Sequence, residues 1–265
     1  MQKYKRYTLS IPTHISDFLT QYFDKILVVS VPRFTERHKA VQQHLQGLPF
    51  DFFWGADKLQ LNYGEAKASG DYDEGKAIQL QRQGKSLNLG EIACSLSHRN
   101  LYATIIEQGW KRVLILEDDV VPLIENMDAL PDAVKELPDG WVLVYLGYLK
   151  HEEITAGLKA KQNFYKILSA FGLMKWSYKM ICNLLPKAYS IHLRKAGFHD
   201  CTHAYAVTLE GAKKLLAAQT PVVYRADDLL SSTIMKGDLN AFVTVPKFFD
   251  QEIFHNTAIA SEIKT

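Results

Sequence analysis

Three consecutive carboxylic acids follow a short apolar segment near the middle of the chain. Residues 112–116 read RVLIL, and Glu117, Asp118 and Asp119 come directly after them. Because like charges this close raise one another's pKa, such a triplet needs a cation or several hydrogen-bond donors nearby. Alternate side chains of an extended backbone share a face, so Glu117 and Asp119 can hold Mn²⁺ or Mg²⁺ together. The alternative is that the three carboxylates only solvate the strand end and cap the next helix.

A second acidic pair, Asp227 and Asp228, stands at the start of a predicted helix. A carboxylate within hydrogen-bond reach of a hydroxyl group can accept its proton, and this pair supplies the candidates for such a general base. Adjacent residues at a helix start point in different directions, so we expect only one of Asp227 and Asp228 to face a site. The alternative for either residue is an N-terminal position favoured by the helix dipole.

A polar stripe marks one face of the predicted helix over residues 89–108. Offsets of three, four and seven residues place Glu91, Cys94, His98 and Tyr102 on the same side of that helix. The stripe either supports a bound ligand or surrounds a hydrogen-bonded core histidine packed under the sheet.

Further candidates lie near the first predicted strand and near the end of the chain. Arg33 and Arg37 follow that strand, where a guanidinium group can contact a phosphate, although a lone surface arginine is usually only solvated. Gly90 either permits close approach of the backbone to a ligand or serves as a turn residue. His255 and His203, late in the chain, are alternative candidates for a metal ligand.

Composition excludes several classes of protein. The 31 basic and 29 acidic residues leave a net charge of +2, too small for a general binder of nucleic acids. Cys94, Cys182 and Cys201 lie far apart, which argues against a disulfide framework and a structural zinc site. No window approaches the roughly 18 apolar residues of a membrane span. We therefore expect a cytoplasmic protein without a nucleic-acid partner.

Strand-like and helix-like segments alternate along the chain. Apolar runs predict strands over residues 25–31, 50–54, 112–116, 141–146, 204–209 and 241–245. Helical spacing predicts helices over residues 35–45, 89–108, 211–218 and 226–235, with Gly109 as a helix end. The polar, glycine-rich residues 55–86 have no strong period and are read as a functional loop region. This order favours an α/β fold with a mostly parallel, doubly wound sheet.

Residues 150–200 depart from that pattern. No Asp or Glu occurs between Ile154 and His199, while lysines alternate with aromatic and aliphatic residues. We expect a basic helical insertion that rests on anionic membrane headgroups, with lysines at the interface and aromatic side chains inserted below it. The alternative is a helical flap whose aromatic residues are ordinary core.

These features together resemble glycosyltransferase family 25, the lipooligosaccharide galactosyltransferases with collagen galactosyltransferases as relatives. Residues 89–98 (LGEIACSLSH) followed by residues 113–120 (VLILEDDV) look like the family's paired signature. Residues 26–37 (ILVVSVPRFTER) are similar to its first strand, although the family more often has Ile-Asn-Leu where this chain has Val29, Ser30 and Val31. Asp227 falls where the family usually carries an Asp shortly before a Leu.

The resemblance implies one domain over residues 1–265 with the fold type called GT-A, which is Rossmann-like and binds a UDP-sugar with Mn²⁺ or Mg²⁺. It implies that Asp119 is a metal ligand, that Glu117 reaches the metal or the ribose, and that His255 completes the shell. The residues that would contact the donor are Val31, Arg33, Arg37, Gly90, Glu91, His98, Glu117 and Asp118. Asp227 or Asp228 would be the catalytic base.

The reaction implied by the resemblance is an inverting transfer of galactose from UDP-galactose to an outer-core sugar of lipooligosaccharide or lipopolysaccharide. Its partner would be a glycolipid or oligosaccharide acceptor. The basic insertion of residues 150–200 would lie on the acceptor or membrane side, in peripheral contact with the cytoplasmic face of an inner membrane. Two other functions stay open. One is a metal-dependent phosphoesterase or nucleotidyltransferase that uses the five carboxylates as a two-metal cluster. The other is a noncatalytic glycan-binding protein that retains the fold.

Overall fold

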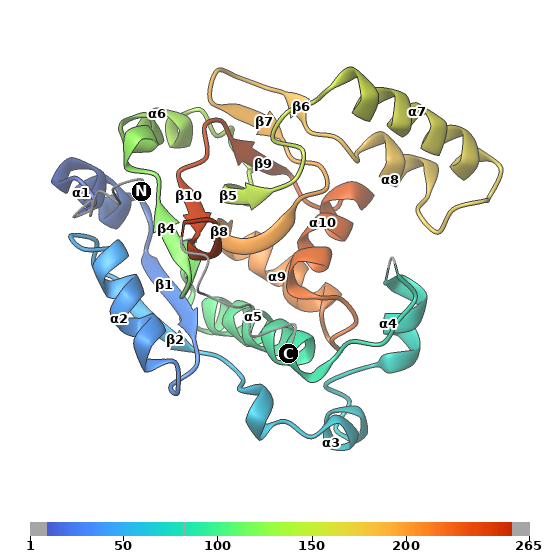
Figure 1. Cartoon of the computed structure of the whole chain (residues 1–265), viewed down its shortest axis with the longest axis horizontal. Coiled ribbons are helices and arrows are strands. Elements are labelled where there is room, and N and C mark those ends of the chain that lie inside the picture. The colour runs from blue at the N-terminus through green and yellow to red at the C-terminus, as the bar shows by residue number, and fades with distance from the viewer. Residues whose placement is uncertain (1–9, 82, 256–265) are drawn as a thin grey trace, which may run out of the picture.

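A central sheet with helices on both faces forms the body of the protein (Figure 1). The computed structural model describes residues 10–81 and 83–255. In this described part the main sheet has eight strands, and a small two-stranded sheet packs beside it. The spatial order is β2 (Asp51–Trp54), β1 (Lys25–Ser30), β3 (Arg112–Glu117), β8 (Asp200–Thr208), β5 (Leu143–Leu149), β9 (Ala241–Thr244), β7 (Leu193–Lys195) and β6 (Lys187–Ala188).

Most of these strands run in the same direction. β2, β1 and β3 pair in parallel, and so do β5 and β9. β8 runs antiparallel between β3 and β5, and β7 runs antiparallel between β9 and β6. Because β8 opposes both of its neighbours, the two parallel groups point the same way. The predicted α/β fold with a mostly parallel sheet is confirmed, and the reversed β8 is a detail that the sequence pattern does not predict.

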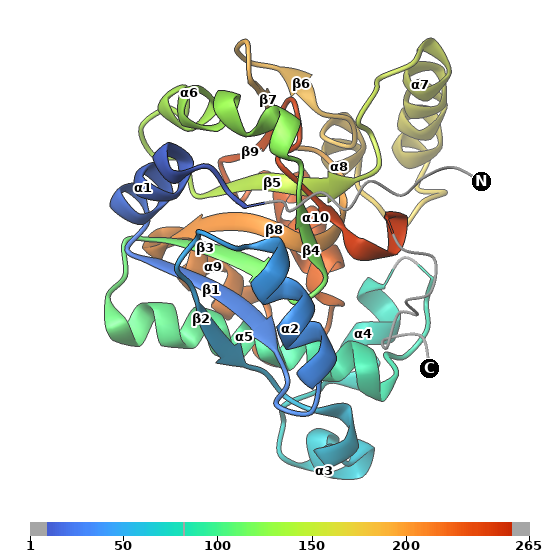
Figure 2. The ribbon, with the colours of Figure 1, turned by 60° about the vertical axis from the view of Figure 1, so that its left-hand side comes forward.

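Alternate residues of β3 reach two separate cores. Leu114 and Leu116 pack against α1 (Thr13–Tyr22), α2 (Thr35–His44) and α6 (Leu130–Lys135). Val113 and Ile115 pack on the other face against α5 (Leu89–Gln108), α9 (Leu209–Ala218) and α10 (Ala226–Lys236). Figure 2 shows helices on either side of the sheet. The continuous apolar run of this strand therefore reflects burial on both faces.

Helix α5 is capped at both ends, by Asn88 and Glu91 at its start and by Gly109 at its end. The Asn88 side chain accepts a hydrogen bond from the Glu91 N–H, while the Glu91 carboxylate accepts one from the Asn88 N–H. Such a reciprocal pair satisfies N–H groups that have no partner inside the helix. Gly109 ends the helix with a φ of 69°, a left-handed conformation that favours glycine. These caps fix the helix whose buried face carries His98.

Two short strands bring the end of the chain beside the acidic triplet. β4 (Val120–Pro122) follows Asp119 at once and pairs antiparallel with β10 (Phe249–Gln251). The 3₁₀ helix η3 (Glu252–Phe254) comes next, and the Glu252 N–H donates to the Asp119 carbonyl at 2.7 Å. A further 3₁₀ helix, η2 (Ile124–Ala129), leads from β4 into α6.

Residues 55–86 contain more regular structure than the sequence predicts. The 3₁₀ helix η1 (Lys58–Gln60) and the helices α3 (Tyr63–Ala68) and α4 (Glu74–Leu80) occupy this segment. The side chains of Asp57, Asn62 and Asp73 cap them. Because helices this short complete few turns, they leave no clear hydrophobic period in the sequence.

The basic insertion forms helices and a hairpin at one edge of the molecule. α7 (Ala156–Ala170) and α8 (Tyr178–Cys182) lie side by side, and β6 with β7 forms the hairpin that follows (Figure 1). None of the residues of α7 is buried, whereas α8 packs on α10. Across the described residues, every helix is too short or too polar to span a bilayer.

Candidate functional site

The carboxyl ends of β1 and β3 meet at one edge of the sheet and open into a cavity. The two strands pair in parallel, with Val29 opposite Glu117. Ligands collect at such strand ends in open α/β sheets. The cavity, which we call the strand-end cavity, has a volume of about 170 Å³. Its lining includes Val31, Arg33, Arg37, Asp57, Lys58, Gly90, Cys94, His98, Glu117, Asp118, Asp119 and Gln251.

Asp118 is held by two side chains from the first strand and the helix after it. The Ser30 hydroxyl donates to one carboxylate oxygen at 2.5 Å, and Arg37 Nη1 donates to the other at 2.7 Å. The side chain of Asp118 is almost fully buried, with 7% exposed. A buried carboxylate needs such partners to stay ionised. Asp118 therefore ties the acidic strand end to Arg37, which also lines the cavity.

Glu117 is held from the opposite direction. The Thr202 hydroxyl donates to Glu117 Oε1 at 2.5 Å, and His98 Nε2 lies 3.5 Å from the same oxygen. Burial alone would raise the pKa of this carboxyl group. The contacts of Glu117 with His98 and Thr202 outweigh burial, so the pKa of Glu117 lies below its usual value. This side chain is thus kept ionised by the protein itself.

Asp119 is the carboxylate whose hydrogen bonding the protein leaves incomplete. Its Oδ2 accepts a hydrogen bond of 3.3 Å from Gln251, but its Oδ1 is buried and has no hydrogen-bond partner. Burial, reinforced by the charges of Glu117 and Asp118, raises the pKa of Asp119 to about 7. A buried carboxylate oxygen without a partner, beside a second ionised carboxylate, is the ligand set that a hard divalent cation prefers. The residues present therefore fit a metal ion at this point.

His98 connects the carboxylates to the core of the protein. Its Nδ1 forms a hydrogen bond of 2.8 Å with the Tyr205 hydroxyl, which lies 2.9 Å from the Tyr102 hydroxyl. Cys94, His98 and Glu117 offer ligand atoms within 4.8 Å of one another, so these residues form a second grouping able to hold a metal. Burial, reinforced by the charge of Glu117, raises the pKa of the Cys94 thiol well above its usual range. Because a metal-binding cysteine must lose its proton, this thiol favours a supporting role.

A second cavity also borders Glu117 and Asp119, and we call it the acceptor cleft after the acceptor sugar that the resemblance implies. Its volume is about 480 Å³. It shares Arg37, Cys94, Glu117, Asp119 and Gln251 with the strand-end cavity. Its remaining lining comes from the starts of α5, α10 and β8, the end of β5 and the 3₁₀ helix η3, with Asn88, Glu91, Leu149, Asp200, Cys201, Thr202, Arg225, Ala226, Asp227, Ile253 and Phe254. The two cavities therefore meet at Glu117 and Asp119.

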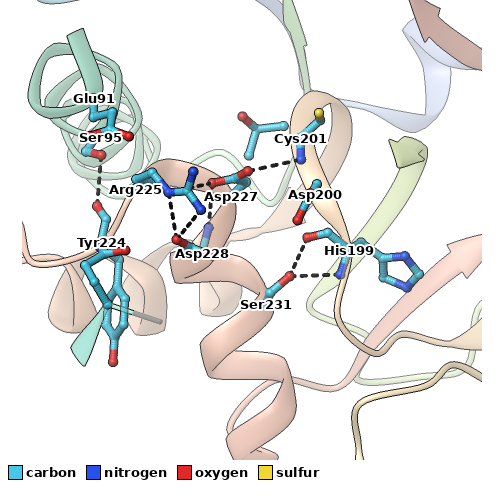
Figure 3. Close-up of polar contacts among 12 residues, drawn as sticks. Glu91, Ser95, His199, Asp200, Cys201, Tyr224, Arg225, Asp227, Asp228 and Ser231 are labelled. Carbon is cyan, nitrogen blue, oxygen red and sulfur yellow. Dashed lines mark hydrogen bonds and ion pairs between the residues drawn. The ribbon is translucent and has the colours of Figure 1, made fainter. Parts of the chain in front are cut away.

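Asp227 faces this cleft from the first turn of α10 (Figure 3). Its Oδ1 accepts a hydrogen bond from the Asp228 N–H at 2.8 Å, and its Oδ2 accepts a long one from the Cys201 N–H at 3.4 Å. Burial, together with the negative charge of Asp228, raises the pKa of Asp227 to about 6. A carboxylate with a raised pKa and few hydrogen bonds is suited to accept a proton near neutral pH.

Asp228 points away from the cleft and pairs with Arg225. The guanidinium nitrogens of Arg225 lie 2.7 Å and 2.8 Å from Asp228 Oδ2. The same guanidinium is 4.0 Å from Asp227 Oδ1. Figure 3 shows Arg225 between the two carboxylates. Of the two candidate bases, the structure places only Asp227 on the wall of the acceptor cleft.

The two candidate histidines contact groups other than Asp119 in the described part of the chain. His255 Nε2 contacts Asp250 Oδ2 at 3.3 Å, and its side chain is 43% exposed. His203 is buried under β10, with its Nε2 donating to the Phe249 carbonyl at 3.4 Å and its Nδ1 without a partner. The part of the chain described here gives neither histidine a contact with Asp119. A histidine ligand from this region stays a prediction.

Other predicted donor contacts reach the cavities with different partners. Arg33 Nε donates to Asp57 at 2.8 Å, and Gly90 lines the strand-end cavity. Glu91 lines the acceptor cleft while it caps α5. Ser30, Thr202 and Gln251 were not among the predicted residues, because each lies far in sequence from the carboxylate that it contacts. Ser30 alone carried a signal, since it is a buried polar residue at the end of an apolar strand.

The sequence that builds this site matches a known family of proteins. Residues 23–230 match the model of glycosyltransferase family 25, which is described as an LPS biosynthesis protein family. This chain belongs to glycosyltransferase family 25. The resemblance inferred from the two motifs is thereby confirmed.

The curated relatives are longer and differ in activity. The glycosyltransferase 25 family member of Anopheles gambiae is 29% identical over 200 residues, which cover 73% of this chain and 28% of that protein. Procollagen galactosyltransferase 1 of Danio rerio is 24% identical over 242 residues, covering 84% and 35%. The inactive glycosyltransferase 25 family member 3 of Homo sapiens is 27% identical over 205 residues, covering 74% and 29%. The activity must therefore be argued from the residues of this chain.

Proposed function

We propose that this chain is an inverting glycosyltransferase that transfers galactose from UDP-galactose to a terminal sugar of a lipooligosaccharide or lipopolysaccharide outer core, with Mn²⁺ or Mg²⁺ at its acidic motif. The observation that carries the proposal is the shared wall of the two cavities. One cavity joins cationic side chains to the carboxylates, and the other joins the same carboxylates to Asp227. A donor and an acceptor placed in these two spaces would meet at Glu117 and Asp119.

The strand-end cavity suits a nucleoside diphosphate. Arg33, Arg37 and Lys58 line it and offer positive charge to phosphate oxygens. Asp118, fixed by Ser30 and Arg37, presents a carboxylate to a ribose or sugar hydroxyl. Asp119 and Glu117 would hold the cation. When bound, a divalent cation supplies Lewis-acid stabilisation of the charge that develops on the departing diphosphate.

Asp227 is suited to the proton transfer. As the acceptor oxygen bonds to the anomeric carbon, the bond from that carbon to the diphosphate oxygen breaks, and Asp227 takes the hydroxyl proton. Attack from the acceptor side and departure on the other side invert the anomeric carbon. Arg225, 4.0 Å from Asp227 Oδ1, steadies this carboxylate without neutralising it, since its shorter contacts go to Asp228.

The choice of galactose and of a lipopolysaccharide acceptor rests on the relatives. One relative is named a procollagen galactosyltransferase, and the family is described as LPS biosynthesis proteins. The site itself fits a UDP-sugar but does not indicate which sugar is transferred. Peripheral contact with an inner membrane and a cytoplasmic location stay predictions.

The two alternative functions receive less support. A two-metal hydrolase would gather its carboxylates around one point, yet Asp228 is turned toward Arg225 and lines a separate small pocket. A noncatalytic binding protein would not need a carboxylate of raised pKa in the acceptor cleft. Asp227 has this property, with a pKa of about 6.

Release of UDP tests the proposal. The protein is incubated with Mn²⁺, a panel of UDP-sugars and a galactose-accepting oligosaccharide, and free UDP is measured with and without acceptor. The proposal expects release that depends on both substrates and is greatest with UDP-galactose, and a product whose new linkage is β by NMR. UDP release at the same rate without acceptor would favour a hydrolase, and no release with any donor would favour a binding protein.

A further inference from the structure

A third cavity lies between the basic insertion and the body of the protein. It opens between α7, the chain segments on either side of α8 and the turn after β5, and its volume is about 540 Å³. We call it the basic pocket. Its lining is Lys150, His151, Leu158, Lys161, Gln162, Tyr165, Leu173, Met174, Lys175, Trp176, Leu184, Leu185 and Phe198.

The charge of this lining has one sign. Lys150, Lys161 and Lys175 line the pocket, and no acidic side chain does. Lys150 pairs with Asp200 at 2.5 Å. Within the described residues, Lys161 lies 5.6 Å from the Tyr165 ring centre, Lys175 reaches only backbone carbonyls, and neither forms an ion pair. Among residues 10–81 and 83–255, no carboxylate pairs with either of these two ammonium groups. Such a pocket favours an anion.

The apolar part of the lining is aromatic. Trp176 and Phe198 pack with ring centres 5.7 Å apart, and Tyr165 stands on α7 across from them. Aromatic walls with a few polar groups are typical of pockets for ligands that have both apolar faces and polar edges. A sugar ring with an anionic substituent has this combination of surfaces.

The basic pocket adjoins the acceptor cleft. Leu149 and Asp200 line the cleft, and Lys150, next in the chain and paired with Asp200, lines the pocket. Lys150 and His151 have φ values of 65° and 57°, and Cys201 has one of 72°. Side chains other than glycine rarely adopt this conformation, and it is concentrated at functional sites. The strained backbone lies at the boundary between the two spaces.

We propose that the basic pocket binds a phosphate or carboxylate group on the acceptor glycan, on a sugar beyond the one that receives the transferred residue. The inference rests on the proposed function, because it takes the cleft at Asp227 as the acceptor site. Lys161 and Lys175 contact the anionic group, and Trp176 packs on the sugar that carries it. The insertion thereby selects charged acceptors over neutral ones.

Binding can be measured without turnover. Trp176 is the only tryptophan among the lining residues, so a ligand in the pocket should change the protein's tryptophan fluorescence. The probes are a synthetic disaccharide with one phosphate monoester and the same disaccharide without it. The proposal expects saturable binding of the phosphorylated probe only. The double variant Lys161→Gln and Lys175→Gln should weaken it about tenfold or more, since charge-assisted contacts are lost.

A matched control removes the same charge elsewhere on the insertion. Lys159 and Lys166 lie on α7 outside the pocket lining. The double variant Lys159→Gln and Lys166→Gln should bind the phosphorylated probe like the wild type, and Trp176→Phe should abolish the fluorescence change while calorimetry still detects binding. Equal affinity for both probes, or equal loss in both double variants, would overturn the proposal.

A lipid headgroup offers the same phosphate chemistry, so vesicles form a separate arm. Two results together would show that the pocket binds lipid and that the glycan proposal is wrong. In the first, the double variant Lys161→Gln and Lys175→Gln no longer floats with phosphatidylglycerol vesicles. In the second, the wild type does not bind the soluble phosphorylated probe. In transfer assays, the ratio of kcat/KM for charged over neutral acceptor should fall in the pocket variant and persist in the control. A protein that binds the probe but transfers no sugar would refute the proposed function alone.

Discussion

When no cation is present, the ionised carboxylate of Asp119 lowers the stability of the folded protein. Its Oδ1 is buried without a partner, and its pKa is raised to about 7. A carboxyl group whose pKa is higher in the folded than in the unfolded state binds its proton more tightly when the protein is folded. Protonation of this group therefore stabilises the fold, and ionisation removes that contribution. This contribution is complete at low pH, below the pKa of the unfolded chain, and is lost as the pH rises through about 7.

The variant Asp119→Asn should therefore be more stable than the wild type at pH 8 in the absence of metal. The expected gain is about 1 to 3 kcal/mol in the free energy of unfolding, because one pKa unit corresponds to about 1.4 kcal/mol. Near pH 4 the two proteins should unfold at the same denaturant concentration. Mn²⁺ at pH 8 should stabilise the wild type and leave the variant unchanged. A wild type as stable as the variant at pH 8 would show that Asp119 carries no such penalty.

The pKa of Asp227 sets the pH dependence that we predict for sugar transfer. With saturating Mn²⁺, kcat/KM should rise with pH through an apparent pKa near 6, because the base must be ionised and its pKa is about 6. Asp227→Asn should lower kcat roughly a hundredfold or more and leave the KM for the donor near its wild-type value.

Asp228→Asn is the matched control for that variant. Burial is the first cause of the raised pKa of Asp227 and the charge of Asp228 is the next, so removing this charge should move the acidic limb of the profile to lower pH. Transfer at neutral pH should stay within about tenfold of the wild type, since Asp228 does not face the cleft. If the two variants lose activity equally, Asp227 is not distinguished as the base.

At the scale of elements, the sequence predicts the strands and long helices better than the residues that connect them. The apolar run of residues 112–116 predicts a buried strand. The helical spacing of apolar residues over 89–108, followed by Gly109, predicts α5. The contacts of Thr202 and Gln251 with the acidic triplet depend on β8 and β10 lying beside β3 and β4. No local pattern encodes such pairing, so these two residues could not be assigned from the sequence.

Helix α7 should unfold independently of the core. Its residues are all at least partly exposed, unlike those of α5, which buries nine. Ala160 in α7 and Ala103 in α5 are both exposed in helix interiors. Ala103→Pro should cost roughly 3 kcal/mol or more in the free energy of unfolding, because proline breaks an interior helix.

Ala160→Pro should cost less than about 1 kcal/mol, since local unfolding of an edge helix leaves the core intact. UDP binding should survive in this variant and fail in Ala103→Pro. Denaturant unfolding of both proteins checks the comparison. An equal cost in the two helices would mean that α7 belongs to the cooperative core.

The loop after β2 should tolerate no side chain at Gly55. A Cβ atom there would lie 2.3 Å from Ser97 Oγ, which accepts a hydrogen bond from the Ala56 N–H. Gly55→Ala should displace the loop that carries Asp57 and Lys58, with a loss of about 1 kcal/mol or more in stability and weaker binding of UDP.

Gly75→Ala is the control, since its Cβ would meet only Asp73 at an ordinary 3.6 Å. Thermal unfolding and calorimetry with UDP measure both variants. If Gly55→Ala binds UDP as tightly as Gly75→Ala does, the loop does not shape the strand-end cavity.

At the scale of the whole molecule, the fold and the family could be predicted, and the division into two adjoining cavities could not. Apolar runs and helical periods are local, and they suffice for an α/β sheet with a mostly parallel order. The reversal of β8 depends on partners far along the chain. This reversal brings Thr202 to Glu117 and places Asp200 and Cys201 in the lining of the cavity that Asp119 also lines.

Calorimetry of UDP binding tests the account most directly. UDP is titrated into the wild type and into Asp119→Ala, each with Mn²⁺ and again with EDTA. The account predicts one saturable site in the wild type with Mn²⁺, at least about tenfold weaker with EDTA, and no effect of Mn²⁺ on the variant. Equal affinity of both proteins under both conditions, or no UDP binding by the wild type at any Mn²⁺ or Mg²⁺ concentration, would contradict it.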